Sequence, residues 1–252
     1  MRHLLLAAVA TLALTGAHAN ATEITLIAPG GIRAALDDLI PQFEAQTGHK
    51  VKATYGSGGG TKARVIKGEA FDVPVVQLPL APVIASGNVV AASETPLAHV
   101  EVGIAVRTGE PKPDISTAER VKKLLLDARA IAYPNAAAGA AAGVSFEETM
   151  HKLGIAEAMK PKIKPAQGGR GAMLLLTKGE IDVGLTFISE IITEPGVELV
   201  DPLPRAISTP TELTAFVSSH ANDKAAAQAL VSFLASPDAA PVYRQHGMEP
   251  GR

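Results

Sequence analysis

Cysteine and tryptophan are absent from this chain of 252 residues, and aromatic residues make up only 4% of it. Without cysteine the protein has no disulfides, thiolate zinc sites, iron–sulfur clusters or cysteine nucleophiles. Sugar-binding sites rely on flat aromatic faces, and this chain has too few aromatic side chains for an extensive stacking surface. These absences argue against a disulfide-rich protein, a metal–thiolate protein and a carbohydrate-binding protein.

An excess of charge of either sign is also lacking. The 23 basic residues nearly balance the 25 acidic ones, so no long-range basic field recruits nucleic acid. The length is sufficient for one large domain or for two of about 100–120 residues each.

The first 19 residues have the features of a secretory signal peptide. Arg2 and His3 precede an apolar stretch over residues 4–14, and residues 17–19 form an Ala-His-Ala cleavage site. The apolar stretch is about half as long as a membrane span requires. We therefore expect cleavage near Ala19, and we expect the mature chain to be free in the periplasm because it has no cysteine to carry a lipid.

Strands, glycine-rich loops and helices alternate along the mature chain, which predicts parallel α/β sheets. Residues 23–28, 51–55 and 73–76 are expected strands, and residues 99–107 form a longer one. Because the pattern restarts after residue 107, we expect two lobes. Residues 20–101 and 205–252 would form the first lobe, and residues 102–204 the second. Two chain crossings would make a hinge with a cleft between the lobes.

Four strand-to-helix junctions are rich in small residues: residues 29–31, 56–61, 141–143 and 167–170. Each offers unpaired backbone N–H groups at the positive end of a helix dipole, which suits an anion. Arg33 and Arg170 lie in the first turns of two of these helices. A single glycine-rich loop is more often only a tight turn, and a single arginine a surface charge. Four such junctions in two lobes favour an anion site.

Sequence signatures of catalysis are missing. The segment Gly56 to Lys62 lacks the serine or threonine that must follow the lysine of a phosphate-binding loop. No G-x-S-x-G motif occurs, and the histidines are not spaced as metal ligands. Asp182 and Glu190 flank an expected strand at the cleft, and we expect both to point away from an anion. We therefore predict no enzyme, no metal site and no cofactor.

The order of several short segments resembles the periplasmic molybdate-binding proteins of ABC importers, which are type 2 solute-binding proteins. The resemblance rests on residues 27–32, 60–64, 71–73, 142–144, 152–154, 165–172, 179–180 and 183–185. It implies the two-lobed α/β fold of that family and a tetrahedral oxyanion held by two serines, backbone amides and a tyrosine.

At the positions that the resemblance assigns to the ligand, this chain has other residues in place of the serines and the tyrosine. The serines fall at Gly31 and Gly60, the amides at Ala142 and Gly169, and the tyrosine at Phe187. Three hydroxyl donors are thus missing, each worth roughly 1.5–3 kcal/mol to an anion. The candidate ligand-binding residues are Gly30, Gly31, Arg33, Ser57, Gly60, Thr61, Ala142, Gly143, Gly169, Arg170 and Phe187.

The function expected is a periplasmic solute-binding protein, a monomer that captures a molybdate- or tungstate-like anion for an ABC permease in the inner membrane. Three alternatives remain open at this point. The ligand could be a small organic carboxylate that an arginine pairs bidentately. The scaffold could instead serve an exported sensor or an exported hydrolase.

Overall fold

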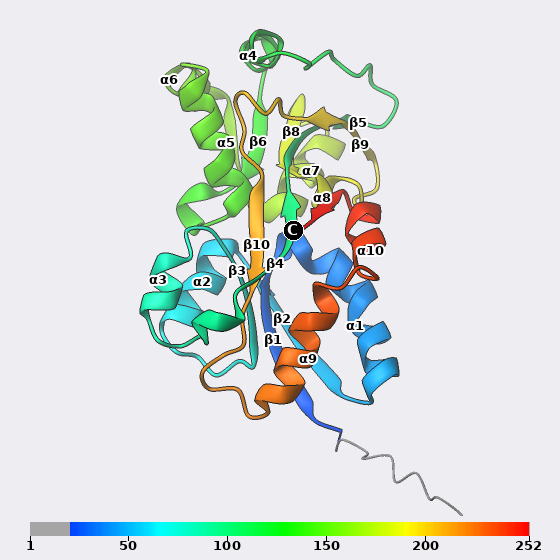
Figure 1. Ribbon diagram of the computed structural model, residues 1–252. Helices are drawn as coiled ribbons and strands as arrows, with labels where there is room; N and C mark the ends of the chain where they lie inside the picture. The colour runs from blue at the N-terminus through cyan, green and yellow to red at the C-terminus, as the bar shows by residue number, and fades with distance from the viewer. Residues whose placement is uncertain (1–20, 252) are drawn as a thin grey trace, which may run out of the picture.

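A computed structural model describes residues 21–251, and its strands form two mixed sheets, one in each of two lobes (Figure 1). The export signal predicted for residues 1–19 lies outside the described residues. The first sheet has the strand order β11-β4-β10-β3-β1-β2, and the second has the order β7-β6-β8-β5-β9. Helices flank both sheets, so the two-lobed α/β architecture predicted from the sequence pattern is confirmed.

The strands of the first sheet are β1 (Glu23–Pro29), β2 (Lys50–Gly56), β3 (Val73–Gln77), β4 (Thr95–Val100), β10 (Thr211–Ala215) and β11 (Met248–Pro250). Those of the second sheet are β5 (Val102–Arg107), β6 (Ile131–Pro134), β7 (Ile163–Ala166), β8 (Val183–Phe187) and β9 (Val197–Pro202).

The α-helices are α1 (Arg33–Thr47), α2 (Gly58–Ile66), α3 (Ala81–Ala85), α4 (Ala118–Asp127), α5 (Ala141–Lys152), α6 (Ala156–Met159), α7 (Gly168–Thr177), α8 (Ile188–Ile191), α9 (Lys224–Leu234) and α10 (Ala240–Gln245). Four 3-10 helices join them, namely η1 (Gly30–Ile32), η2 (Ala91–Ser93), η3 (Ala136–Ala138) and η4 (Lys160–Lys162).

Both sheets mix parallel and antiparallel pairs, which corrects the expectation of purely parallel sheets. β1 lies parallel to β2 and β3, and β6 lies parallel to β7 and β8. β10 is antiparallel to β3 and β4, whereas β5 is antiparallel to β8 and β9. The parallel pairs come from local strand–helix–strand units, which leave a pattern in the sequence. The antiparallel pairs join strands distant along the chain, which leave none.

The chain passes from the first lobe to the second at Glu101. Residues 99–107, expected as one strand, are the end of β4 and the whole of β5, which belong to different sheets. The flanking Val100 and Val102 are both buried, so the apolar pattern does not reveal the break. The Glu101 carboxylate pairs with Arg205, at 2.8 Å, on the segment that returns to the first lobe. This ion pair joins the two crossings.

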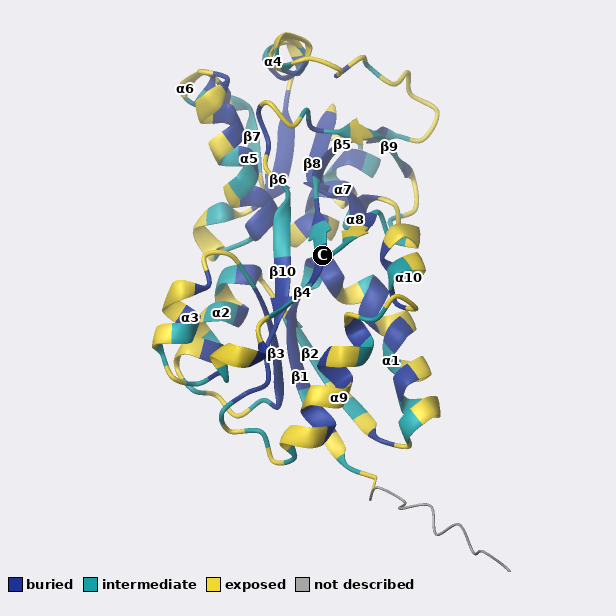
Figure 2. Ribbon diagram, in the orientation of Figure 1, coloured by how far each residue is buried: buried dark blue, intermediate teal, exposed yellow. Residues whose placement is uncertain are grey.

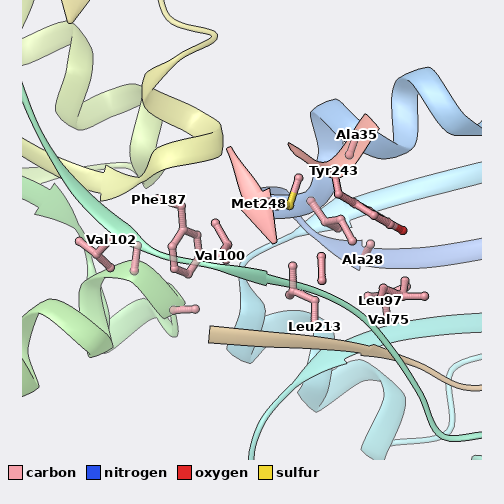
Figure 3. Close-up of a cluster of buried hydrophobic side chains, with 14 of the residues drawn as sticks. Ala28, Ala35, Val75, Leu97, Val100, Val102, Phe187, Leu213, Tyr243 and Met248 are labelled. Carbon is pink, nitrogen blue, oxygen red and sulfur yellow. The ribbon is translucent and has the colours of Figure 1, made fainter. Parts of the chain in front are cut away.

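A single apolar cluster runs through the crossing and includes side chains of both lobes. Figure 3 shows Leu97, Val100 and Leu213 of the first sheet in line with Val102 and Phe187 of the second. Burying each of these larger side chains stabilises the fold by roughly 1.5–3 kcal/mol. The lobes are therefore held together by a shared core at the crossing.

The C-terminal helices return to the first lobe and pack on α1. The rings of Phe43 in α1 and Phe233 in α9 lie 5.5 Å apart between centroids. Figure 2 shows the inner strands of both sheets mostly buried and the outer faces of these helices exposed, whereas the edge strand β2 has no buried residue. Over residues 21–251, none of the helices combines the length and the apolar character that crossing a bilayer requires.

A second contact joins the lobes away from the crossing, between the start of α2 and η3. The Gly59 N–H donates to the Gly139 carbonyl oxygen at 2.8 Å. A Cβ on Gly59 would lie only 3.0 Å from the Cα of Gly139 and 3.1 Å from its oxygen. Gly139 itself has φ of 77°, a conformation that favours glycine. The loops can meet because neither residue has a side chain.

Gly59→Ala is therefore expected to separate the lobes at this contact without unfolding either one. Alanine suits the helical backbone of α2 better than glycine does, so only the approach of Gly139 is disturbed. Spin labels on cysteines introduced at the exposed Lys67 and Glu157 report the interlobe distance, since the natural chain has no cysteine. We expect a longer or broader distance distribution by double electron–electron resonance.

The matched control is Gly171→Ala in α7, where a Cβ would meet nothing closer than 3.6 Å. Its distance distribution should equal that of the unmodified chain. A Gly59→Ala distribution that also equals it would show that the glycine contact does not restrain the lobes.

Candidate functional site

A cavity of about 830 Å³ lies between the lobes and is lined by residues of both. The loops that follow β1 and β2 form its wall in the first lobe, and those that follow β6, β7 and β8 form its wall in the second. Ligands of open α/β sheets bind outside the carboxyl ends of the strands. The position of this cavity agrees with that rule.

Three helical segments begin at the cavity wall without a side-chain cap: η1 after β1, α5 after β6, and α7 after β7. Their first N–H groups have no acceptor within the helix, and the helix dipole makes them electropositive. An anion in the cavity would supply the acceptor that all three lack. The geometry therefore suits a negatively charged ligand.

Ser57 starts the fourth helix, α2, and its hydroxyl is already engaged. It accepts a hydrogen bond from the Gly60 N–H at 3.1 Å and donates one to the Ala138 carbonyl oxygen of the other lobe at 3.2 Å. The serine thus caps its own helix and links the lobes at the edge of the cavity.

Two arginines stand on opposite walls, Arg33 from the first lobe and Arg170 from the second. Arg33 pairs with Asp37 at 3.2 Å and lies over the Tyr55 ring, 5.1 Å from its centroid. The Tyr55 hydroxyl donates to Asp37 at 3.0 Å. Burial, together with the Asp37 charge, raises the pKa of Tyr55 above its usual range, so the phenol stays neutral.

Arg170 has a weaker partner and is the more exposed of the two arginines. It approaches Glu194 at 3.5 Å, and 80% of its side chain is accessible to solvent. Long exposed pairs of this kind contribute little to stability. Both guanidinium groups can therefore turn toward a ligand at small cost.

Glu190 faces the cavity, which corrects the expectation that it points away from the site. It accepts a hydrogen bond from the Thr186 hydroxyl. Burial raises the pKa of Glu190, although hydrogen bonds from Thr186 and from the Phe187 backbone oppose the shift. The expectation rested on repulsion between a carboxylate and an anion, and a raised pKa weakens that repulsion because it favours the neutral acid. Asp182 lies elsewhere, paired with Arg129 at 3.0 Å.

Gly31 and Phe187, two of the positions where a hydroxyl is missing, touch across the lobes. A Cβ on Gly31 would lie 2.7 Å from Cδ2 of the Phe187 ring. The ring thus occupies the space in which a serine side chain at position 31 would stand. The position of the ring therefore accounts for the glycine at position 31, whereas the phenylalanine itself lacks the hydroxyl of a tyrosine.

Eight of the predicted ligand-binding residues line the cavity: Gly30, Gly31, Arg33, Ser57, Ala142, Gly169, Arg170 and Phe187. The other three are not among its lining residues. The Thr61 hydroxyl is buried and donates to the Ala28 carbonyl oxygen at 3.4 Å. Gly60 lies behind the Ser57 hydroxyl, and Gly143 lies against the Pro134 carbonyl.

Other lining residues were not among the predicted ones: Asp37, Tyr55, Asn135, Gln167, Thr193 and Glu194, together with Glu190, which was expected to point away. Three of them stand directly at strand ends, namely Tyr55 in β2, Asn135 after β6 and Gln167 after β7. Their position at a strand end is a signal that could have found them. Asp37 and Glu194 carry no such signal, because each comes to the cavity on a helix or turn beyond the loop.

Residues 21–251 contain no cluster of three or more histidine, aspartate or glutamate side chains arranged to hold a metal ion. The polar groups around the cavity are backbone amides, two arginines and a few carboxyl, amide and hydroxyl side chains. Such a set binds and orients an anion, and Glu190 adds one group able to exchange a proton.

Comparison with known proteins places the chain in a family. A sequence model of bacterial extracellular solute-binding proteins matches residues 24–249. The chain is 31% identical over 235 residues to the aconitate isomerase of a Pseudomonas species, covering 91% of this chain and 88% of that protein. It is 27% identical over 234 residues to the molybdate-binding protein of Azotobacter vinelandii, covering 91% and 90%.

The solved structure of the periplasmic molybdate-binding protein of Azotobacter vinelandii shares the fold. It superposes with a TM-score of 0.75 at 20% sequence identity, covering 91% of this chain and 100% of that one. The chain therefore belongs to the bacterial extracellular solute-binding proteins, as a divergent relative of the molybdate-binding proteins.

Proposed function

We propose that the protein is an exported solute-binding protein that captures a small anion between its lobes and delivers it to an ABC permease. The observation that carries this proposal is the convergence of three uncapped helix starts, from both lobes, on one cavity. An anion that bridges them stabilises the closed arrangement of the lobes, which the permease would select.

We place the boundaries of the two lobes where the chain passes from one sheet to the other. Residues 20–101 and 205–252 would form the first lobe, and residues 102–204 the second, supported by the change of sheet after Val100 and again before Thr211. The site of action would be the periplasm, after cleavage near Ala19. The working form would be a monomer with no nucleic-acid partner and no cofactor.

The ligand class that we propose is an organic anion with two or more carboxylates, in preference to a molybdate-like oxyanion. The Phe187 ring against Gly31 leaves no hydroxyl at either position to hold a tetrahedral ion. Arg33 and Arg170 on opposite walls suit two separate carboxylates, which guanidinium groups bind bidentately. The cavity volume of about 830 Å³ is in the range typical of organic ligands, roughly 300–1,000 Å³.

A second candidate function is isomerisation of such a polycarboxylate. Two observations favour it: the 31% identity to an aconitate isomerase, and the presence of Glu190 in the cavity wall. A double bond can change position or geometry when a proton leaves one carbon and another is added at the end of the allylic system. A raised pKa brings a buried carboxyl closer to the operating pH, which favours such a transfer.

A ligand panel separates these possibilities by thermal unfolding. Citrate, trans-aconitate, tricarballylate, succinate, molybdate, tungstate, sulfate and phosphate would be added singly to the protein. A ligand at 100 times its dissociation constant stabilises the fold by about 2.7 kcal/mol. For a chain of this size we expect a rise in Tm of about 5–10 °C with tricarboxylates and a smaller rise with tetrahedral ions.

No shift with any anion would refute the proposed function, and a larger shift with molybdate or tungstate would refute the ligand class. Proton NMR of trans-aconitate with the protein tests the second candidate. Conversion to the cis isomer supports an isomerase. Binding without conversion refutes the isomerase and leaves the solute-binding protein as the remaining proposal.

Arg33→Ala and Arg170→Ala are each expected to weaken binding of the most stabilising tricarboxylate at least about tenfold. Each removes a charged donor worth roughly 1.5–3 kcal/mol to a carboxylate. Neither should alter ligand-free Tm by more than about 2–4 °C, because the lost surface pairs contribute at most about 1 kcal/mol. Isothermal titration calorimetry measures the affinity.

Arg64→Ala is the matched control. Arg64 pairs with Glu69 at 2.7 Å and lies 4.9 Å from the centroid of the Phe71 ring, as Arg33 pairs with Asp37 and lies over Tyr55. It is not among the residues that line the cavity. The affinity of Arg64→Ala for the tricarboxylate should match that of the unmodified protein. Unchanged affinity in both cavity variants would show that the arginines do not contact the ligand.

A further inference from the structure

Glu190 lies between the helix starts of the two lobes. A Cβ on Gly169, at the start of α7, would lie 2.3 Å from Oε2 of Glu190. A Cβ on Gly30, in η1, would lie 3.9 Å from Oε1. The carboxyl group can take this place only because position 169 has no side chain. It therefore stands beside the amides to which an anion would bind.

The charged side chains around Glu190 pair with one another and not with Glu190. The elements packed around the cavity bring Arg33 and Asp37 from α1, Tyr55 from β2, Arg170 from α7 and Glu194 from the turn after α8. Arg33 pairs with Asp37, and Arg170 with Glu194. Among the described residues, no ion pair includes Glu190. Its partners are neutral, the Thr186 hydroxyl and the Phe187 backbone.

Part of this arrangement has a structural explanation. Glu190 is the third residue of α8, and its carboxyl bonds back to Phe187, the residue before the helix. A glutamate or glutamine at this position can accept from the backbone N–H of the residue before the helix, which is one half of a capping box. That role would be served equally by glutamine, and it needs only one carboxyl oxygen. It does not explain why the group faces a cavity that suits anions.

Two effects favour the neutral acid when an anion is bound. Burial disfavours the carboxylate, and a bound anion adds a like charge next to it, which disfavours the carboxylate further. The neutral acid has an O–H donor that a ligand oxygen can accept. It would supply one of the donors that are missing at Gly31 and Phe187.

We propose that Glu190 binds the ligand as a neutral acid, shares its proton with a ligand carboxylate oxygen, and so makes anion capture take up a proton. The inference rests on the proposed function, because it requires that the cavity bind an anion. A ligand carboxylate is a stronger acceptor than a neutral oxygen, so Glu190 would select for carboxylates. Capture would strengthen as the pH falls.

The test is isothermal titration calorimetry with trans-aconitate and tricarballylate, in buffers of different ionisation enthalpy between pH 6 and pH 8. Glu190→Gln keeps the cap and a hydrogen-bond donor but cannot titrate. We expect the unmodified protein to take up as much as one proton more per bound ligand than Glu190→Gln. As the pH rises above the pKa of Glu190 in the free protein, the affinity of the unmodified protein should fall by as much as tenfold per pH unit relative to that of Glu190→Gln.

Glu69→Gln is the matched control, because Glu69 pairs with Arg64 at 2.7 Å away from the cavity lining, and its loss should leave the proton uptake unchanged. Carbon-13 NMR of the glutamate carboxyls gives a readout without ligand. The signal lost in Glu190→Gln should titrate above the ordinary glutamate pKa of about 4.3.

Binding with equal proton uptake in the unmodified protein and Glu190→Gln would overturn this inference alone. A Glu190 signal that titrates at or below the ordinary value would also overturn it. Absence of binding by any anion would overturn the proposed function and this inference together, so the two failures are distinguishable.

Discussion

Backbone N–H groups without an acceptor are the constraint on which the site depends. Helices that start at the carboxyl ends of parallel strands direct their first amides to the same edge of the sheet. Here both sheets do so, and η1, α5 and α7 begin at one cavity without side-chain caps. The fold thereby creates an electropositive region from backbone dipoles, to which Arg33 and Arg170 add charge. This agrees with the near-neutral charge of the chain, since an anion is attracted by local dipoles.

Close contacts at glycines allow the lobes to approach one another. Gly59 meets Gly139 at one edge of the cavity, and Gly31 meets the Phe187 ring inside it. The first contact joins the lobes through a backbone hydrogen bond, and the second replaces hydroxyl groups with apolar packing. The same glycines that permit closure therefore determine which donors remain for a ligand. Closure and specificity share one set of residues.

The carboxyl group of Glu190 separates this site from a simple oxyanion receptor. A charged carboxylate beside three helix starts would compete with an anionic ligand, whereas a neutral acid would bind it. Its environment of glycine backbone, Thr186 and Phe187 contains no cation to favour the charged form. The same group would serve a receptor as a hydrogen-bond donor and an isomerase as a proton carrier. The two candidate functions thus differ by one property of one side chain.

The sequence by itself determined the two-lobed α/β fold and the part of the site formed by local junctions. Glycine-rich loops between a strand and a helix are visible in the chain, so Gly30, Ser57, Gly169 and their neighbours could be predicted at the cavity. Only the tertiary structure decided the rest. The break at Glu101, the antiparallel strand pairs and the contact between Gly31 and Phe187 join residues that are distant along the chain or lie within an unbroken apolar pattern.

Glu190 illustrates the physical reason for this division. Its direction from α8 depends on a gap at Gly169 in a different helix, and its protonation depends on what the folded chain excludes from around it. Periodicity and local spacing report which backbone groups a segment exposes. They do not report which groups from other segments will surround a side chain, and that surrounding decides its charge.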